Sequence, residues 1–579
     1  MAAVESNVYS LEQPRSLFPL YNPVSMAVQT YELEKIAKRI ISTLATLGEY
    51  PHIRYYEPLN ARSNLCNRLA HQVQSELDAL CRIDTDFPPE SPFKRAVLII
   101  VDRSMDMVTP LVHEFTYQAM MNDLLVVEGG KVIYKQEGGA STDSNAAQAQ
   151  SPSLDEGDAI WQLIRHWHFA EAVEYVRETF NKFISENKAA SAALGHAEGE
   201  GAAAGGIDSL KAMKDTLSAL PQFQEMKAKF SVHINICAEC QTTFARRRLE
   251  QVATVEQNLS TGELADGRPA KNVMPDMVPL LVDEDVSPLD KVRMLMLYII
   301  SLNGIQDTER RRLLEHAKLS LEEIQAITNL NLMGVRLSHS LDKKEEKDER
   351  GHYAYRQHAK KKAKGKGGND DNPYDLSRWV PILKTIMQEQ AKNTLDPTIF
   401  PWIAEPPISE LGGLTKTVSK SQPLLARSPA NALTPPDPNH PNSLRTTRPS
   451  WATKRPPESK NEANKDETQK EKEAKTVGGD LRKNGPRIIL FVLGGVTFSE
   501  MRSCYEVMRE TGREIILGGT HILNPTQLLE SLKELHKADA ALTSLSPTTP
   551  ATATLPELDK RASVVDDGKK KKLGMFKKK

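Results

Sequence analysis

Two runs of apolar residues, rich in β-branched side chains, stand far apart in this sequence of 579 residues, at Ala96–Val101 and Arg487–Leu493. Such continuous runs are typical of parallel strands covered on both faces, because a strand with one face in water alternates apolar and polar residues. Each strand needs neighbours, and the simplest architecture places both runs in one sheet. We therefore predict an α/β fold with a split parallel sheet, in which the sequence between the runs is a large, mainly helical insertion domain.

Turn and capping signals support strands and helices around the second run. The glycine pair Gly494-Gly495 follows it, and the capping box Thr497-x-x-Glu500 predicts the start of a helix. The pattern then repeats with a strand at Glu514–Leu517 and an N-cap at Asn524, which is followed by proline. Alternating strands and helices of this kind indicate a parallel sheet.

The insertion is helical by its apolar periodicity. We expect helices there, and one before the first strand, at Met26–Gly48, His113–Leu125, Ala159–Phe183, Ile207–Ser260, Ser287–Asn303, Asp307–His316, Ser320–Asn331 and Leu376–Lys392.

Segments poor in apolar residues divide the chain, because they cannot bury enough surface to offset the entropy of ordering. They lie at Gln136–Asp158, Asn187–Gly206, Leu341–Asn372 and Glu405–Leu481, and after Ala541. We therefore expect a first α/β part at 1–108, an insertion domain at 109–404, a disordered Pro/Ser/Lys-rich insert at 405–481, a second α/β part at 482–541 and a disordered basic tail at 542–579.

Composition excludes several classes of protein. Lys and Arg number 75 against 76 Asp and Glu, so the formal charge of −1 does not suggest a nucleic-acid binder. Five scattered cysteines fit a reducing compartment. No stretch reaches the roughly 20 apolar residues of a membrane span, and the start shows no signal peptide. We expect a soluble, intracellular, multidomain protein.

Asp102 and Asp106 raise the question of catalysis, because ligands of parallel sheets bind at the carboxyl ends of the strands. A phosphoryl-transfer acid usually has a second carboxylate two residues on, whereas here it comes four residues on. We favour a structural role, in which Asp102 and Arg103 cap the strand and bridge it to the insertion. The alternative is an aspartate-dependent phosphatase.

The metal and cofactor motifs are incomplete. His113-Glu114-x-x-Tyr117 lacks the second histidine of a metalloprotease motif. Cys237-x-x-Cys240 has no second pair for zinc and lies within a helical pattern, so packing on one helix face explains it better. The glycine pairs after the strands complete no phosphate-binding motif. We predict no catalytic residue, metal or cofactor.

A proline interrupts the long helical pattern at Ile207–Ser260. Apolar residues from Ile207 to Leu220 follow one helix face, Pro221 then breaks the pattern, and helical sequence resumes at once. A proline inside a helix costs about 3 kcal/mol or more. We predict a hairpin of two helices whose junction at Pro221 can bend or straighten; the alternative is a helix–loop–helix fixed in the core.

The sequence resembles the Sec-one/Munc-eighteen (SM) family, and it is most similar to the exocytic, plasma-membrane branch. The resemblance extends over most of the ordered sequence from Asn7 to Leu535, in the order of the family. The phrases that carry it are ATLGEYPHIRY (Ala45–Tyr55), VDRSMDMVTPLVHEFTYQAMMNDLL (Val101–Leu125), SALPQF (Ser218–Phe223), KVRMLMLYIISLNGI (Lys291–Ile305), LSRWVPILKTIM (Leu376–Met387), IILFVLGGVTFSEMRSCYEV and GGTHILNP.

The resemblance implies a function without catalysis. Family members bind syntaxin-type SNAREs and assembled SNARE bundles, and they govern vesicle docking and fusion. The family pattern places Pro221 at a hinge of the helical hairpin and Ile234 and Ile236 on its SNARE-facing helix. It makes Asp102, Arg103 and Asp106 a structural signature where the sheet passes into the insertion.

Some expectations concern location and departures from the family. The resemblance implies a cytoplasmic protein held at plasma-membrane or vesicle sites through SNAREs; Golgi, endosomal or vacuolar traffic is the alternative. The lysines of the tail Lys569–Lys579 suit weak contact with an anionic membrane. Family members begin with a further α/β domain that this sequence does not match, which puts the usual cleft for closed syntaxin in doubt.

Overall fold

A six-stranded sheet joins the two ends of the described chain in this computed structural model. The sheet order is β1-β2-β8-β7-β4-β3, and all strands except β1 run parallel. The strands are β1 (Ala2–Glu5), β2 (Val8–Ser10), β3 (His52–Tyr55), β4 (Val97–Asp102), β7 (Ile488–Leu493) and β8 (Ile515–Gly519). The structure describes residues 2–23, 26–57, 64–128, 131–133, 154, 156–186, 224–338, 374–407 and 481–536, all within the first of two compact units, Met1–Lys537 and Ala538–Lys579.

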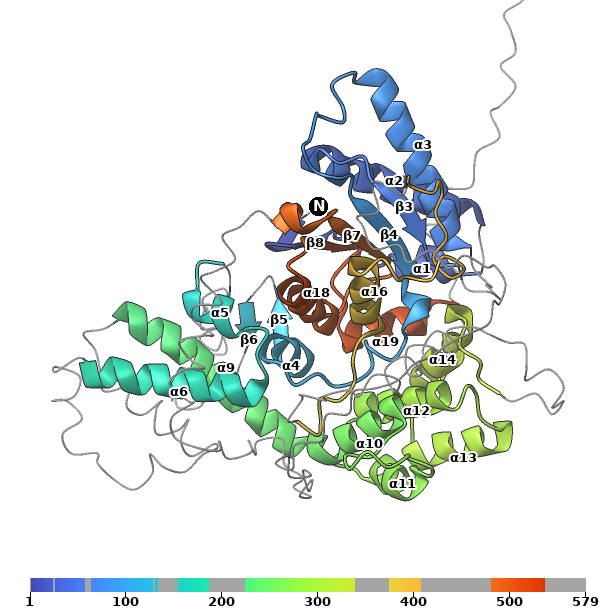
Figure 1. The fold of residues 1–579 in the computed structure, drawn as a ribbon. Coiled ribbons are helices and arrows are strands. Elements are labelled where there is room, and N and C mark those ends of the chain that lie inside the picture. The colour runs from blue at the N-terminus through green and yellow to red at the C-terminus, as the bar shows by residue number, and fades with distance from the viewer. Residues whose placement is uncertain are drawn as a thin grey trace, which may run out of the picture. The chain divides into compact units, whose positions relative to one another are not determined.

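The pairing of β4 with β7 confirms the predicted fold class. The two strands pair along their full length, from Val97 opposite Ile488 to Asp102 opposite Leu493, and Figure 1 shows them side by side at the centre of the sheet. Every residue of both strands is buried. Because both faces of these strands are covered, successive residues need not alternate between apolar and polar side chains. This explains the continuous apolar runs in the sequence.

Helices from both halves of the chain cover the sheet. α2 (Met26–Leu47) and α3 (Leu65–Ile83) pack against each other, and α3 contacts β3 and β4. α18 (Phe498–Thr511) and α16 (Ile382–Ala391) pack against each other and contact β8 and β7 respectively. Smaller contributions come from α1 (Leu17–Tyr21), α19 (Pro525–Glu534) and the 3-10 turns η1 (Arg103–Met105) and η5 (Leu481–Asn484).

The insertion is mainly helical. Its helices are α4 (Tyr117–Leu124), α5 (Ala159–Ile164), α6 (Phe169–Glu186), α9 (Gln224–Arg246), α10 (Leu249–Thr261), α11 (Met274–Val282), α12 (Pro288–Ser301), α13 (Asp307–Ala317) and α14 (Leu321–Asn329), which η3 (Leu330–Met333) extends. A two-stranded ribbon, β5 (Val126–Glu128) and β6 (Lys131–Ile133), follows α4. No helix among the described residues is long and apolar enough to span a bilayer.

Two expected helices are interrupted, and the two interrupted segments are joined by backbone hydrogen bonds. The helix expected at His113–Leu125 begins only at Tyr117, and the one expected at Ala159–Phe183 breaks between α5 and α6. The N–H groups of Tyr117 and Gln118 donate to the carbonyls of Trp167 and Arg165 in that break, at 3.0 and 2.9 Å. Free N–H groups at a helix start need acceptors from elsewhere, so this long-range pairing overrides the local helical pattern.

The described residues cover only part of the predicted domains. The sheet draws strands from both predicted α/β parts, 1–108 and 482–541. α16, from the predicted insertion domain at 109–404, packs on that sheet as well. Most of the insert at 405–481 and all of the tail at 542–579, including Lys569–Lys579, lie outside the described residues.

We predict that Gly518→Ala destabilises the sheet. Gly518 lies opposite Tyr9 in the β2–β8 pair, and an added Cβ would stand 2.1 Å from the Cζ atom of Tyr9. Moving this buried ring costs about 1–3 kcal/mol of unfolding free energy, which urea denaturation measures. Thr526→Ala, at an exposed position of α19, is the control, and equal midpoints for the two variants would contradict the placement of Tyr9.

Candidate functional site

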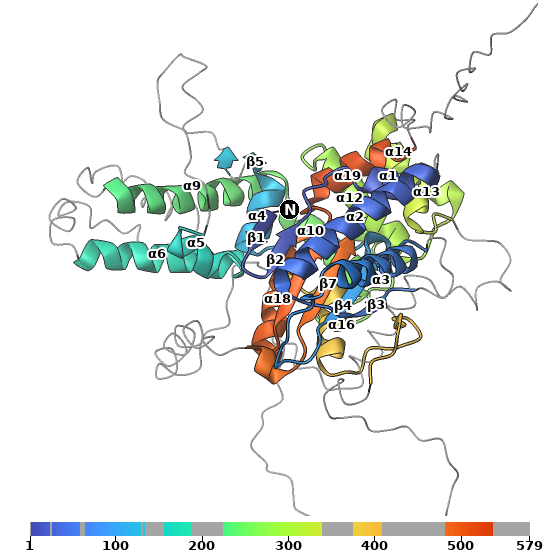
Figure 2. The same ribbon diagram turned by 90° about the horizontal axis from the view of Figure 1, so that it is seen from above.

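The helices α6 and α9 form a hairpin, and both Figure 1 and Figure 2 show them side by side with their far ends away from the sheet. Aromatic rings join them: Phe180 and Phe183 of α6 lie 5.6 and 5.8 Å from Phe230 of α9, measured between ring centroids. The hairpin expected within Ile207–Ser260 is only partly described: α9 lies in its second half, whereas its first half and the expected hinge at Pro221 lie outside the described residues.

Ile234 and Ile236 are not placed as the resemblance implied. Their exposed fractions are 1% and 0%, and both belong to the apolar core. The cause is that α9 contacts α4, α6 and α10 at once, so its apolar side chains are enclosed on more than one face. In this conformation the two isoleucines stabilise the hairpin and cannot contact a SNARE helix, and the prediction that they form the binding surface is wrong for it.

The accessible face of α9 carries small, polar and charged residues, the charged ones being the half-buried Glu239 and the exposed Arg246. Ser231, Asn235 and Ala238 are half-buried, and Thr242 and Ala245 are exposed. These positions follow each other at helical spacing and so form one stripe along the helix. This spacing is visible in the sequence, but the predicted contact residues were the apolar Ile234 and Ile236, so the stripe was missed.

Buried polar contacts anchor the base of the hairpin. His233 of α9 is fully buried, with its Nδ1 atom 2.8 Å from the hydroxyl of Tyr117 and its Nε2 atom 3.1 Å from Asp158. Asp158 also caps α5 by accepting from the N–H groups of Ile160 and Trp161. Burial alone would raise the pKa of Asp158, but the His233 and Trp161 hydrogen bonds outweigh it and hold that pKa below its ordinary value. α4, α5 and α9 are thus linked through one histidine.

The segment Tyr374–Arg378, near the end of the insertion, also contacts the base of the hairpin. The Tyr374 ring stacks on His168, just before α6, with centroids 3.4 Å apart and planes 4° from parallel. Four residues later, the Arg378 Nη2 atom donates to Asn258 of α10 at 2.7 Å. Burial, with a smaller effect of Arg502, lowers the pKa of His168 to about 3, so the stacked ring is uncharged.

The cysteine pair of α9 is a packing feature. Cys237 and Cys240 are both free thiols and fully buried, and burial raises the pKa of Cys237 to about 12. Within the ranges that the structure describes, no group of three or more His, Cys, Asp or Glu side chains could hold a metal ion. The favoured interpretation from sequence, two cysteines packed in a helix, agrees with this placement.

Arg103 links the end of β4 to the start of α18. Its guanidinium donates to both carboxylate oxygens of Glu500, from Nη1 at 2.9 Å and from Nη2 at 2.8 Å, and both side chains are at most 1% exposed. Glu500 also closes the capping box of α18, because its Oε2 accepts from the N–H of Thr497 at 2.9 Å. Burial lowers the pKa of Arg103, but the charge of Glu500 outweighs this and raises it above its ordinary value. The Arg103 guanidinium therefore stays charged in the core, opposite the carboxylate of Glu500.

Asp102 and Asp106 hold the turn beside this pair. Asp106 accepts from the N–H groups of Val108, Thr109 and Ile382 at 3.0, 2.9 and 3.2 Å, and Asp102 accepts from the hydroxyl of Ser104. Asp102 is 4% exposed and Asp106 is 2% exposed. A buried carboxylate that accepts three backbone N–H groups is suited to fixing a turn rather than to attacking a substrate.

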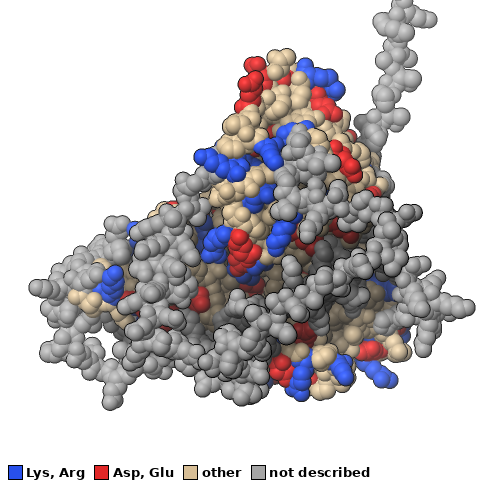
Figure 3. All heavy atoms as spheres, viewed as in Figure 1, with Lys and Arg blue, Asp and Glu red and all other residues tan. Residues whose placement is uncertain are grey.

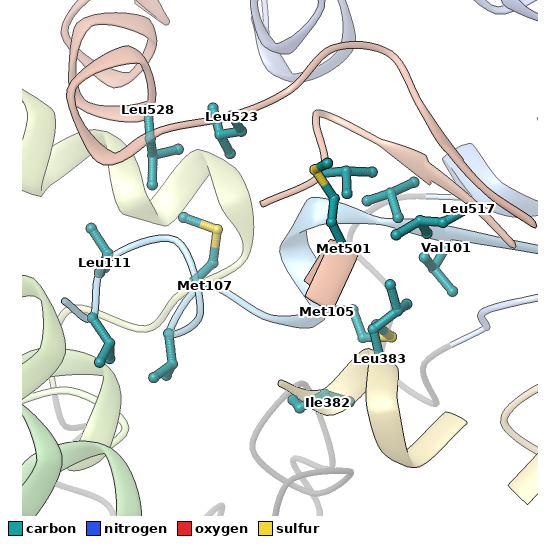
Figure 4. Packing of buried hydrophobic residues seen from close by; sticks show 14 of the residues in the cluster. Val101, Met105, Met107, Leu111, Ile382, Leu383, Met501, Leu517, Leu523 and Leu528 are labelled. Carbon is teal, nitrogen blue, oxygen red and sulfur yellow. The ribbon is translucent and has the colours of Figure 1, made fainter. Parts of the chain in front are cut away.

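Apolar packing surrounds the turn. Figure 4 shows Met105, Leu383 and Met501 close together, where η1, α16 and α18 meet, and each is at most 2% exposed. The three signature residues Asp102, Arg103 and Asp106 thus lie together where the sheet, α16 and α18 converge. They are separate from the α6–α9 hairpin in their contacts.

Charge is mixed on the described part of one face of the molecule (Figure 3). On the face drawn in Figure 3, acidic and basic side chains of the described residues are interspersed. Such a surface does not concentrate one sign of charge for a polyanion.

The chain matches a family model and several known proteins that carry related names. The Sec1 family model matches residues 1–531. Protein transport protein sec1 of Dictyostelium discoideum is 33% identical over 535 residues, covering 92% of this chain and 76% of that protein. SNARE-interacting protein KEULE of Arabidopsis thaliana is 28% identical over 547 residues, covering 93% of this chain and 76% of that protein.

A solved structure shares the fold. The Unc18–syntaxin 1 complex of Monosiga brevicollis contains a chain that superposes with a TM-score of 0.62 at 24% identity, covering 92% of this chain and 76% of that one. At this level of identity the likeness concerns the fold alone.

We predict that Arg103→Met lowers the free energy of unfolding by about 3–5 kcal/mol, because it leaves the Glu500 charge buried without a partner. Urea denaturation measures the loss. The double variant Arg103→Met/Glu500→Gln should recover part of it, because it removes the orphaned charge and keeps the capping geometry.

The matched control for this variant is Arg177→Ala. Arg177 pairs with Glu174 on the half-exposed side of α6, and its loss should cost at most about 1 kcal/mol. Equal losses for Arg103→Met and Arg177→Ala would contradict the role given to the buried pair.

Proposed function

Because the chain belongs to the Sec1 family, we propose that it binds syntaxin-type SNAREs and assembled SNARE bundles and thereby regulates vesicle docking and fusion in exocytosis. The observation that carries this proposal is the likeness to sec1-named transport proteins over nine-tenths of the chain. The name of KEULE, SNARE-interacting protein, gives the partner class. The Unc18-like structural neighbour was solved bound to a syntaxin.

Exocytosis is favoured over other transport steps by the extent of the matches. The Dictyostelium and fission-yeast sec1 proteins align with 92% and 93% of the chain. The sly1 homologue of Drosophila melanogaster is 26% identical over only 54% of it. Golgi, endosomal or vacuolar traffic is therefore the weaker alternative.

The surface proposed for SNARE contact is the outward stripe of α9 from Ser231 to Ala245. A SNARE motif is an amphipathic helix, and helix recognition commonly places such a helix in a groove or along a helix pair. Small side chains at the stripe allow the backbone of a partner helix to approach closely. The α6–α9 core beneath it is held by buried aromatic contacts, so the surface is pre-organised for binding.

The protein acts in this proposal by holding helices rather than by catalysis. The two acids that sequence analysis considered for a phosphatase, Asp102 and Asp106, are buried and engaged in turn hydrogen bonds. The proposed location is the cytoplasmic side of plasma-membrane or vesicle sites, reached through SNAREs. The hinge at Pro221 and membrane contact by the tail stay predictions, since neither segment is described.

Binding of the full chain to a syntaxin-type SNARE bundle tests the proposal. We expect Thr242→Arg, which places a bulky charge on the outward stripe, to weaken binding about tenfold, equivalent to about 1.4 kcal/mol. Thr328→Arg is the matched control: Thr328 is also exposed on a helix, α14, and both hydroxyls donate to a carbonyl one turn back, at 2.9 Å.

The outcomes separate two claims. Absence of binding by the wild-type chain to syntaxin-type SNAREs, free or assembled, would overturn the proposed function. Equal binding by wild type and both variants would leave the function standing and would remove the α9 stripe as the contact surface.

A further inference from the structure

Six charged or titratable side chains meet in the core beside the hairpin base. We define the His113 network as His113, Asp123 of α4, Arg247 between α9 and α10, Glu256 of α10, and Asp290 and Arg293 of α12. Five of them are at most 7% exposed in their side chains, and Arg247 is 14% exposed. Nothing in the proposed function uses this network.

Both ring nitrogens of His113 face carboxylates. Nδ1 lies 2.8 Å from Glu256 Oε2, which also accepts the backbone N–H of His113 at 2.9 Å. Nε2 lies 3.4 Å from Asp290 Oδ1 and 3.8 Å from Asp123 Oδ2. A neutral imidazole has one N–H and one lone pair, so it would turn the lone pair toward an anion. The imidazolium form has an N–H on each side and suits both.

The number of charges in the His113 network also favours the protonated form of His113. Three carboxylates stand against the two arginines: Arg293 donates from Nη1 to both oxygens of Asp123 at 2.9 and 2.8 Å, and Arg247 donates from Nε to Asp290 at 3.0 Å. With neutral His113 the network carries one uncompensated negative charge in the core, and with protonated His113 it is balanced. Uncompensated buried charge is strongly unfavourable.

The same segment holds the base of the hairpin. Two residues after His113, the carbonyl of Phe115 accepts the N–H of Phe169, the first residue of α6, at 2.7 Å. The Phe115 ring lies edge-on to Phe244 in the last turns of α9, with centroids 5.5 Å apart, and it also stacks on the His113 ring. Anything that displaces His113 therefore displaces contacts to both hairpin helices.

We propose that protonation of His113 controls how firmly the α6–α9 hairpin is fixed to α10 and α12, so that loss of this proton as the pH rises loosens the hairpin base. His113 faces Asp123 from α4, Glu256 from α10, and Asp290 and Arg293 from α12, and Arg247 reaches it through Asp290. The contact between the α6–α9 hairpin and the helices α10 and α12 would thus depend on one proton.

The direction of the pH effect follows from the environment. Burial and the charge of Arg293 lower the pKa of His113, but the nearby carboxylates of Glu256, Asp123 and Asp290 outweigh them and raise it above its ordinary value. A raised pKa in the closed state means that the stabilisation is complete below the pKa of the opened state, about 6.5, and is lost as pH rises through the closed-state pKa.

Hydrogen exchange of the full chain between about pH 6 and 8.5 tests this, with rates corrected for intrinsic exchange. Between the opened-state and closed-state pKa values, each pH unit should multiply the opening equilibrium of α4 and the hairpin base about tenfold. No SNARE is needed for this readout. A flat opening equilibrium across the range in the wild-type chain would overturn the proposal.

Two variants assign the effect to His113. His113→Gln should raise opening at pH 6 and abolish its pH dependence. Glu256→Gln should move the pH-dependent range to lower pH, because a neutral His113 then balances the remaining charges. His316→Gln, at an exposed histidine of α13, should keep the wild-type profile.

Retention of the wild-type pH profile by either His113→Gln or Glu256→Gln would overturn the assignment. If His113→Gln does not fold, the comparison of wild type with Glu256→Gln decides it alone.

Discussion

The fold depends on the pairing of β4 with β7, two strands that come from opposite ends of the described chain. Six consecutive parallel pairs join them, and both strands are buried over their whole length. The Arg103–Glu500 pair lies directly beyond their ends and fixes the first turn after β4 to the N-terminus of α18. Because both halves must be present for this core to close, the helical insertion is attached at two points of a single rigid sheet.

The insertion divides its own stability between apolar packing and buried polar contacts. Aromatic rings hold α6 to α9, whereas His233, the Tyr374–His168 stack and the His113 network hold the hairpin to its neighbours. Apolar contacts respond little to pH, and buried charged groups respond strongly. A hairpin with an apolar interior and a polar base should therefore respond to pH chiefly at its base.

Sequence analysis was most successful where a local signal matched the tertiary structure. The apolar runs at Ala96–Val101 and Arg487–Leu493 predicted the split sheet, and the capping box at Thr497 and Glu500 marks the start of α18 as observed. The break between α5 and α6 was missed, because its carbonyls are satisfied by Tyr117 and Gln118, far away in sequence. Ile234 and Ile236 were misplaced for a related reason: apolar residues on a helix show that something covers them, but not whether it is the chain itself or a partner.

Hydrogen exchange of the full chain, with and without an assembled syntaxin-type SNARE bundle, tests the central claim most directly. We place the proposed SNARE-binding surface on the α6–α9 hairpin of the insertion and not on the α/β sheet. We expect added protection within α6 and α9 when the bundle binds, while β4 and β7, already buried, change little. Protection confined to the helices that cover the sheet, with α6 and α9 unchanged, would contradict this placement.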